Sequence, residues 1–95
     1  MNEVQISLIC KALGDANRLK IVNKLAEGSR CGCNLLEDFN ITQPTLSHHM
    51  KILCDSGLVV AEKDGRCINY RLCCKMLKKF KEYIYGLECS FKEEC

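Results

Sequence analysis

Residues 43–51, with the sequence Gln-Pro-Thr-Leu-Ser-His-His-Met-Lys, are typical of the second helix of a helix-turn-helix. Thr42 can cap the N-terminus of such a helix, and Pro44 is tolerated in its first turn. Residues 31–39 favour a short preceding helix, with a turn at Asn40. The apolar side chains of the second helix recur at helical spacing, at Leu46, Met50, Ile52 and Leu53.

A β-hairpin is predicted directly after this helix. Residues 58–61 and 67–72 are β-prone, and the Asp64-Gly65 pair between them is typical of a tight turn. Further helices are predicted over residues 4–13, from Asp15 as N-cap to Gly28, and over residues 75–87. The order predicts a mainly α (α+β) fold, a winged helix-turn-helix with a two-stranded β-hairpin, in a single domain over residues 1–95.

The composition is that of an ordinary globular chain, with 47% hydrophobic and 27% charged residues among 95. No apolar run approaches the roughly 20 residues that span a bilayer, and no secretory signal pattern is found, so we expect a cytoplasmic protein without membrane contact. A chain this short buries a modest core, so a partner subunit would help to stabilise it. No separate catalytic constellation of nucleophile and base is found, so we do not expect an enzyme.

Double-stranded DNA is the expected partner of the second helix and the hairpin. Gln suits adenine, Ser and Thr suit several bases, and basic side chains reach phosphate or the minor groove. The net charge of +2 adds only weak support. The candidate DNA contacts are Gln43, Thr45, Ser47, His48, His49 and Lys51 of the helix, and Lys63 and Arg66 of the hairpin turn. Adjacent residues do not share a helix face, so we expect one histidine to face DNA and the other to pack inward.

Nine cysteines in 95 residues are unusual. Their odd number and the lack of an export signal favour free thiols, used for soft-metal binding or redox sensing. We expect about half of them to be small buried core residues.

Cys31 and Cys33 flank Gly32 at the start of the short helix. Residues two apart on an ideal helix point about 200° apart, so both thiols reach one ion only at a distorted helix start, which Gly32 permits. The helix N-terminus and Arg30 are predicted to lower the pKa of these thiols. The ions suited to such thiols are trivalent arsenic or antimony, cadmium, lead and thiolate-bound zinc.

Arsenite prefers three sulfur ligands, so a third cysteine is sought. Cys10 in the first helix can approach the site of a partner subunit, and Cys89 with Cys95 is a candidate for a second site across a dimer. Cys54 is expected to pack inward. The cysteines that flank the hairpin are predicted to be structural, namely Cys67, Cys73 and Cys74.

Several motifs together resemble the ArsR/SmtB family of metalloregulatory repressors over nearly the whole chain. Residues 13–21 (Leu-Gly-Asp-Ala-Asn-Arg-Leu-Lys-Ile) resemble the second-helix signature of the family, and residues 31–36 (Cys-Gly-Cys-Asn-Leu-Leu) resemble the metal box of its arsenic and cadmium sensors. Residues 43–53 with 57–59 resemble its recognition helix. The wing matches at Asp64-Gly65-Arg66 and Tyr70.

The resemblance implies a homodimeric repressor whose first and last helices form the interface, and which leaves its operator when metal binds. Cys31 and Cys33 take the ligand roles by direct match, and no cofactor is required. Some arsenic sensors carry a further cysteine where this chain has Leu36. Both histidines lie in the recognition helix, so the last-helix site of the zinc, nickel and cobalt sensors is absent.

The short N-terminus and the Gln43-Pro44 start resemble the arsenic sensors, which favours As(III) and Sb(III) as inducers. A Cd(II)- or Pb(II)-responsive repressor is the alternative within the family. A thiol redox-sensing repressor and a metal buffer without DNA activity are the other hypotheses.

Overall fold

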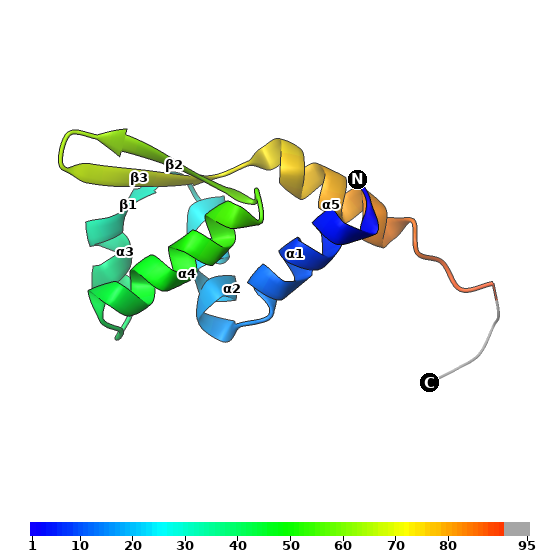
Figure 1. Ribbon diagram of the computed structural model, residues 1–95, viewed down its shortest axis with the longest axis horizontal. Coiled ribbons are helices and arrows are strands. Elements are labelled where there is room, and N and C mark those ends of the chain that lie inside the picture. The colour runs from blue at the N-terminus through cyan, green and yellow to red at the C-terminus, as the bar shows by residue number, and fades with distance from the viewer. Residues whose placement is uncertain (91–95) are drawn as a thin grey trace.

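The computed structural model describes residues 1–90 and has the predicted winged helix-turn-helix architecture (Figure 1). The helices are α1 (Glu3–Leu13), α2 (Ala16–Ala26), α3 (Gly32–Asp38), α4 (Gln43–Asp55) and α5 (Cys74–Tyr85). The strands are β1 (Arg30–Cys31), β2 (Val59–Asp64) and β3 (Cys67–Leu72). The helix-turn-helix is formed by α3 and α4, and the wing by β2 and β3.

Side-chain caps fix the starts of the helices where the sequence predicts them. The Asp15 carboxylate accepts the backbone N–H of Asn17 at 2.9 Å and begins α2, and the Thr42 hydroxyl accepts the N–H of Thr45 at 3.3 Å and begins α4. The hydrogen bond from the Arg18 backbone N–H is the largest cause that lowers the pKa of Asp15. The caps therefore set the register of α2 and α4, which carry much of the core.

The sheet contains a third strand that the sequence did not predict. The strand order is β1-β3-β2, and both pairs are antiparallel. In β1, Arg30 lies opposite Tyr70 and Cys31 lies opposite Asn69. A two-residue strand is too short to show an alternating pattern, so only its pairing with β3 reveals it. Through β1, the start of α3 is attached to the wing.

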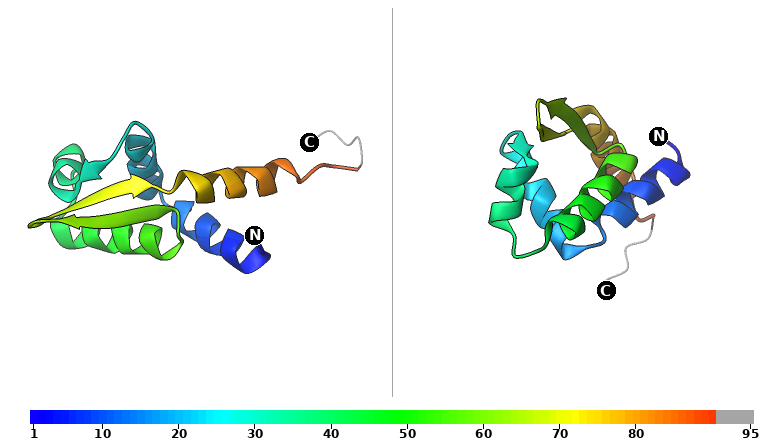
Figure 2. Two further views of the ribbon diagram at one scale, coloured as in Figure 1. Left: turned by 90° about the horizontal axis from the view of Figure 1, so that it is seen from above. Right: turned by 60° about the vertical axis from the view of Figure 1, so that its left-hand side comes forward.

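The hydrophobic core lies between α1, α2, α3, α4 and the sheet. Its largest fully buried side chains are Ile9, Ile21, Leu35, Met50, Leu53 and Leu58. The molecule is elongated, 53 Å by 25 Å by 23 Å. The tip of the wing lies at one end, and α5 extends toward the other end, where the free end of α1 also lies (Figures 1 and 2). Within residues 1–90 no helix is both long and apolar enough to cross a membrane.

Candidate thiol site and nucleic-acid interface

The N-terminal half of α4 exposes most of the predicted DNA contacts. Gln43, Thr45, Ser47 and His48 are exposed, whereas Leu46 and Met50 on the opposite side are buried. We call these four exposed residues the reading face of α4. The Thr45 hydroxyl lies 2.9 Å from that of Thr42, and so it also takes part in the helix cap.

The two adjacent histidines are separated in the way that helical geometry requires. His48 is exposed, but His49 is only 7% exposed, and its Nδ1 lies 3.1 Å from a guanidinium nitrogen of Arg18. A guanidinium only donates, so Nδ1 accepts and the proton of a neutral His49 is on Nε2. Arg18 also donates to the Ala12 carbonyl oxygen at 2.6 Å. The structure thus places His49 between helices and not on the reading face.

Basic side chains flank the reading face. Lys51 is exposed, but its ammonium lies 3.0 Å from the Asp55 carboxylate, which competes with phosphate for this charge. Lys63 and Arg66 are exposed on either side of the wing turn. In that turn Gly65 has a φ of 63°, which glycine adopts without strain. The wing therefore presents two cations at the same end of the molecule as the reading face.

Cys31 and Cys33 lie at the junction of β1 and α3. Cys31 ends β1 and caps α3, and its Sγ accepts the backbone N–H of Asn34 at 3.4 Å. Cys33 is exposed in the first turn of α3. The predicted helix start at Cys31–Gly32 is confirmed, and both thiols belong to that start.

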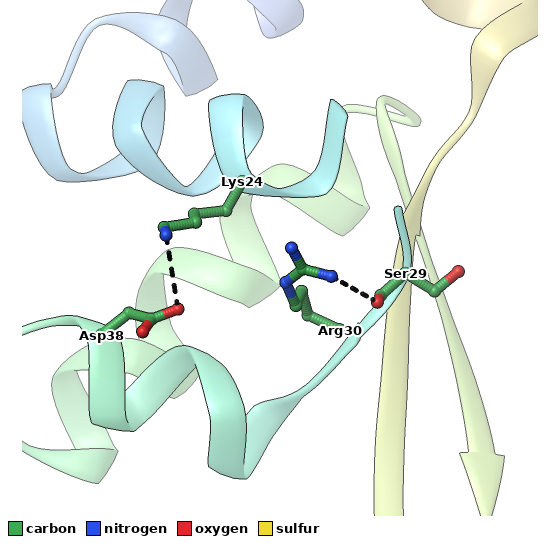
Figure 3. Close-up of polar contacts among 4 residues, drawn as sticks. All are labelled: Lys24, Ser29, Arg30 and Asp38. Carbon is green, nitrogen blue, oxygen red and sulfur yellow. Dashed lines mark hydrogen bonds and ion pairs between the residues drawn. The ribbon is translucent and has the colours of Figure 1, made fainter. Parts of the chain in front are cut away.

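The prediction that Arg30 and the helix N-terminus lower the thiol pKa is wrong for Cys33. The pKa of Cys33 is raised, first by the neighbouring Cys67 and then by Cys31 and by burial. The Arg30 guanidinium instead donates to the Ser29 carbonyl oxygen at 3.3 Å (Figure 3). The same view shows the ion pair of Lys24 with Asp38, at 3.8 Å, which joins α2 to α3. Crowding of thiols, which favours their neutral form, is therefore the main cause of the raised pKa of Cys33.

A cavity of about 210 Å³ lies between α3, α4 and the wing, and we call it the thiol–wing cavity. Its lining includes Cys33 and Leu36 of α3, Gln43 and Ser47 of α4, and Arg66 and Cys67 of the wing. One predicted thiol ligand thus shares a cavity with three predicted DNA contacts. The prediction of a structural role for Cys67 does not fit its exposed position beside Cys33.

The remaining cysteines are distributed over the molecule. Cys10 is exposed on α1, and Cys89 is exposed after α5. Cys54 is partly buried, as predicted, and burial is the main cause that raises its pKa. Cys95 lies outside the described residues.

The expectation that about half of the cysteines are core residues is wrong, because none of the eight described cysteines is fully buried. Five of them are exposed and three are partly buried. Within residues 1–90, no three His, Cys, Asp or Glu side chains lie close enough together in this structure to hold a metal ion. An ion that binds three of these thiols therefore requires the thiols to move.

Comparison with known proteins gives the family. Residues 15–60 match the bacterial regulatory proteins of the arsR family. The chain is 49% identical over 72 residues to the arsenical resistance operon repressor of Staphylococcus aureus, which covers 76% of this chain and 69% of that protein. It is 44% identical over 63 residues to the protein of the same name from Bacillus subtilis, covering 65% of this chain and 60% of that one.

Solved structures show the same fold. The crystal structure of an ArsR family transcriptional regulator superposes with a TM-score of 0.82 at 22% identity, covering 90% of this chain and 88% of that one. The homodimeric winged helix-turn-helix DNA-binding domain of a possible ArsR-family regulator from Mycobacterium bovis superposes with a TM-score of 0.73 at 27% identity, covering 85% and 76%.

The fold and the exposed α4 and wing define a DNA-binding transcriptional regulator and not an enzyme. With 49% identity over more than two thirds of a curated relative, the chain belongs to the ArsR family of bacterial regulatory proteins. The predicted family is thereby confirmed.

Proposed function

We propose that this protein is a repressor that binds operator DNA as a homodimer and is released when arsenite or antimonite binds the thiols of Cys31 and Cys33. The observation that carries the proposal is the position of these thiols at the start of α3, the helix that precedes the reading helix α4. The similarity to arsenical resistance operon repressors supports As(III) as the inducer. A reducing cytoplasm would keep both thiols available for binding.

The DNA-binding role is supported by the exposed reading face of α4 and the cations of the wing. A recognition helix reads base edges through the side chains near its N-terminus, which is where Gln43 and Ser47 lie. Because the net charge is only +2, binding depends on a few well-placed contacts and not on a strongly basic surface. Lys63 and Arg66 would hold the adjacent phosphates or enter the minor groove.

The dimer is supported by apolar side chains that this chain leaves uncovered on α1, at the end of α5 and directly after it. Val4 is 68% exposed, Tyr85 is 84% exposed and Leu87 is 66% exposed. No residue of α5 is buried, although apolar residues recur along it at helical spacing. A second copy that covers α1 and α5 would remove this surface from water. The homodimeric M. bovis domain with the same fold supports a dimer as the form of this chain.

The coupling between thiols and DNA would operate through the β1–α3 junction. Side chains two residues apart diverge on a helix, so holding one ion with both Cys31 and Cys33 distorts the first turn of α3. Because β1 is paired with β3, the distortion acts on the wing as well as on the helix-turn-helix. The ligand releases DNA only if the distorted shape holds it more tightly than the DNA-bound shape does.

Fluorescence anisotropy on a labelled fragment of the promoter upstream of the gene tests the proposal. The reduced wild-type protein should bind the fragment and be released by arsenite and antimonite, with zinc inert. Cys31→Ser and Cys33→Ser should bind it but remain bound when arsenite is added, whereas Cys74→Ser, at another exposed cysteine, should respond normally. Normal release from both site variants would show that the inducer binds at another site. Release by cadmium but not by arsenite would identify the protein as a cadmium- or lead-responsive repressor.

Redox sensing is the second candidate function, because Cys33 and Cys67 line one cavity. Their oxidation by peroxide would form one disulfide and reduce one H₂O₂ to two waters. Release of DNA by peroxide without metal, reversed by dithiothreitol, would favour this function. Peroxide without effect at concentrations where arsenite acts would exclude it.

A further inference from the structure

The Cys31–Gly32–Cys33 motif provides two sulfurs at the start of α3, and Leu36 lies one turn after Cys33 in this helix. A trivalent arsenic held by two protein sulfurs keeps one oxygen ligand from water, and a third thiolate replaces it. The question of a third ligand follows from the proposed function and rests on it. The structure narrows the choice among the remaining cysteines.

The sheet register brings one cysteine of the wing to the start of α3. Arg30 pairs with Tyr70 and Cys31 pairs with Asn69, so the same antiparallel register continued by two residues places position 33 opposite position 67. The chain turns into α3 at Gly32, close enough to β3 that a Cβ there would lie 3.6 Å from the Tyr70 ring. Cys33 therefore remains beside Cys67 although the strand has ended, and both line the thiol–wing cavity.

The other described cysteines do not share this position. Cys10 is on α1, which projects from the end of the molecule opposite the wing tip (Figure 2). Cys54 is partly buried near the end of α4, and Cys89 follows α5. Among the described residues that line the thiol–wing cavity, the cysteines are Cys33 and Cys67 alone.

We propose that Cys67 of the wing is the third sulfur ligand of the metalloid, together with Cys31 and Cys33 of the same protomer. Arsenous acid, As(OH)₃, exchanges three As–O bonds for three As–S bonds. The three thiol protons leave with the three hydroxyl groups as three waters, and arsenic remains trivalent. No oxidant, reductant or second subunit is needed.

The third bond gives the ligand a direct connection to the DNA-binding surface. Cys67 follows Arg66 in the chain, and both line the cavity with Gln43 and Ser47 of the reading face. The three thiols are not yet arranged around one point, so binding must draw the turn end of the wing, where Cys67 pairs with Asp64, and the start of α3 together. That movement repositions Arg66 relative to α4. The two conformations would therefore differ in their affinity for operator DNA.

Two arsenic compounds distinguish the role of the third sulfur from the roles of the other two. Arsenite accepts three thiolates, whereas phenylarsine oxide accepts two, because one bond of its arsenic is occupied by the phenyl carbon. Cys67→Ser should weaken arsenite binding by at least the roughly 10–100-fold that loss of an outer-shell partner costs at a metal site, and leave phenylarsine oxide binding unchanged. Cys74→Ser, another exposed cysteine near the wing, is the matched control and should change neither.

X-ray absorption at the arsenic edge provides a direct count of ligands. The wild-type protein loaded with arsenite should show three sulfurs, and the Cys67→Ser protein two sulfurs and one oxygen. Circular dichroism and thermal unfolding of the free variant establish that it is folded. Loss of phenylarsine oxide binding in folded Cys67→Ser would show that Cys67 is one of two primary ligands and would overturn its role as the third.

The results also separate this inference from the proposed function. Wild-type arsenite affinity and three sulfurs in Cys67→Ser, with binding lost in Cys31→Ser and Cys33→Ser, would overturn the inference and leave the proposed function in place. Unchanged arsenite binding in all three variants would overturn both. Arsenite binding lost in Cys31→Ser and Cys33→Ser and weakened in Cys67→Ser, with phenylarsine oxide binding retained by Cys67→Ser, is the result we expect.

Discussion

Helices α4 and α5 are similar in length, with 13 and 12 residues, and each carries an apolar stripe, but they use it differently. Four residues of α4 are buried, whereas none of α5 is buried. The reason lies in their neighbours, because α4 packs against α1, α2 and β2. Helix α5 contacts the core only through partly buried residues of its first half, Met76, Leu77 and Phe80, and its end projects from the body (Figure 1). An apolar stripe thus marks a face that will be covered, without saying whether the same chain covers it.

The largest expected effect comes from comparing the loss of a buried residue in the α4 stripe with the loss of an exposed residue in the α5 stripe. Leu53 in α4 is fully buried, so Leu53→Ala removes its packing and leaves a cavity. We expect the free energy of unfolding to fall by about 2–5 kcal/mol at every protein concentration, as measured by urea denaturation. Ile84→Ala in α5, where Ile84 is 44% exposed, should have little effect in dilute protein. Equal losses in both variants at low concentration would show that Ile84 is packed within its own chain.

The next prediction concerns the surface that covers α5. Ile84→Glu places a charge in the proposed dimer interface and should weaken the dimer by about 2 kcal/mol or more, as expected at a hot spot. Sedimentation equilibrium measures the dissociation constant, and the thermal midpoint should lose its dependence on protein concentration. Lys78→Glu, at an exposed polar position of the same helix, is the control. An unchanged dimer in Ile84→Glu would place the interface elsewhere.

The polar faces of the two helices should differ as well. Gln43→Ala on α4 should cost operator affinity by about 1–3 kcal/mol and relax the preference at one base pair, because a side-chain amide makes a bidentate contact with a base. Lys79→Ala on the exposed face of α5 should alter affinity little. Anisotropy with operator variants measures both quantities. Uniform weakening over all sequences by Gln43→Ala would indicate that Gln43 contacts phosphate and not a base.

The smallest effect is a pH dependence at the N-terminus of α2, a helix that packs against α4. The pKa of Asp15 is lowered in the folded protein, mainly by the Arg18 N–H, so its contribution to stability is present above the unfolded pKa and is lost as pH falls through the folded pKa. Below about pH 5 the thermal midpoint of the wild type should therefore fall more than that of Asp15→Asn, which keeps a capping oxygen but does not titrate. Parallel curves would show that the cap contributes equally in both charge states.

Local patterns predicted most of this fold because they are determined by nearby residues. The caps at Asp15 and Thr42, the apolar spacing of α4 and the Asp64-Gly65 turn each depend on a few neighbours in the chain. The strand β1 was not predictable in this way, since its two residues are ordered by pairing with β3.

The same distinction applies to the thiol site. The Cys31–Gly32–Cys33 motif predicts where the thiols lie in the sequence, and the structure places both at the start of α3. The raised pKa of Cys33 and its position beside Cys67 depend on a contact between residues that are far apart in the chain. Composition and helical spacing carry no information about that contact, so it required the sheet register.

The cap at the start of α3 has a consequence for the sensitivity of the proposed sensor. The sulfur of Cys31 accepts the Asn34 N–H at 3.4 Å, so the atom that would bind arsenic is already engaged by the helix that it begins. An As–S bond draws electron density from that sulfur and weakens its hold on the N–H. Under the proposed function, the helix cap and the inducer would therefore compete for one sulfur, and a stronger cap would raise the arsenic concentration needed for the response. Asn34→Pro, which removes this backbone N–H in the first turn of α3, would change the threshold of the response without replacing a proposed arsenic ligand.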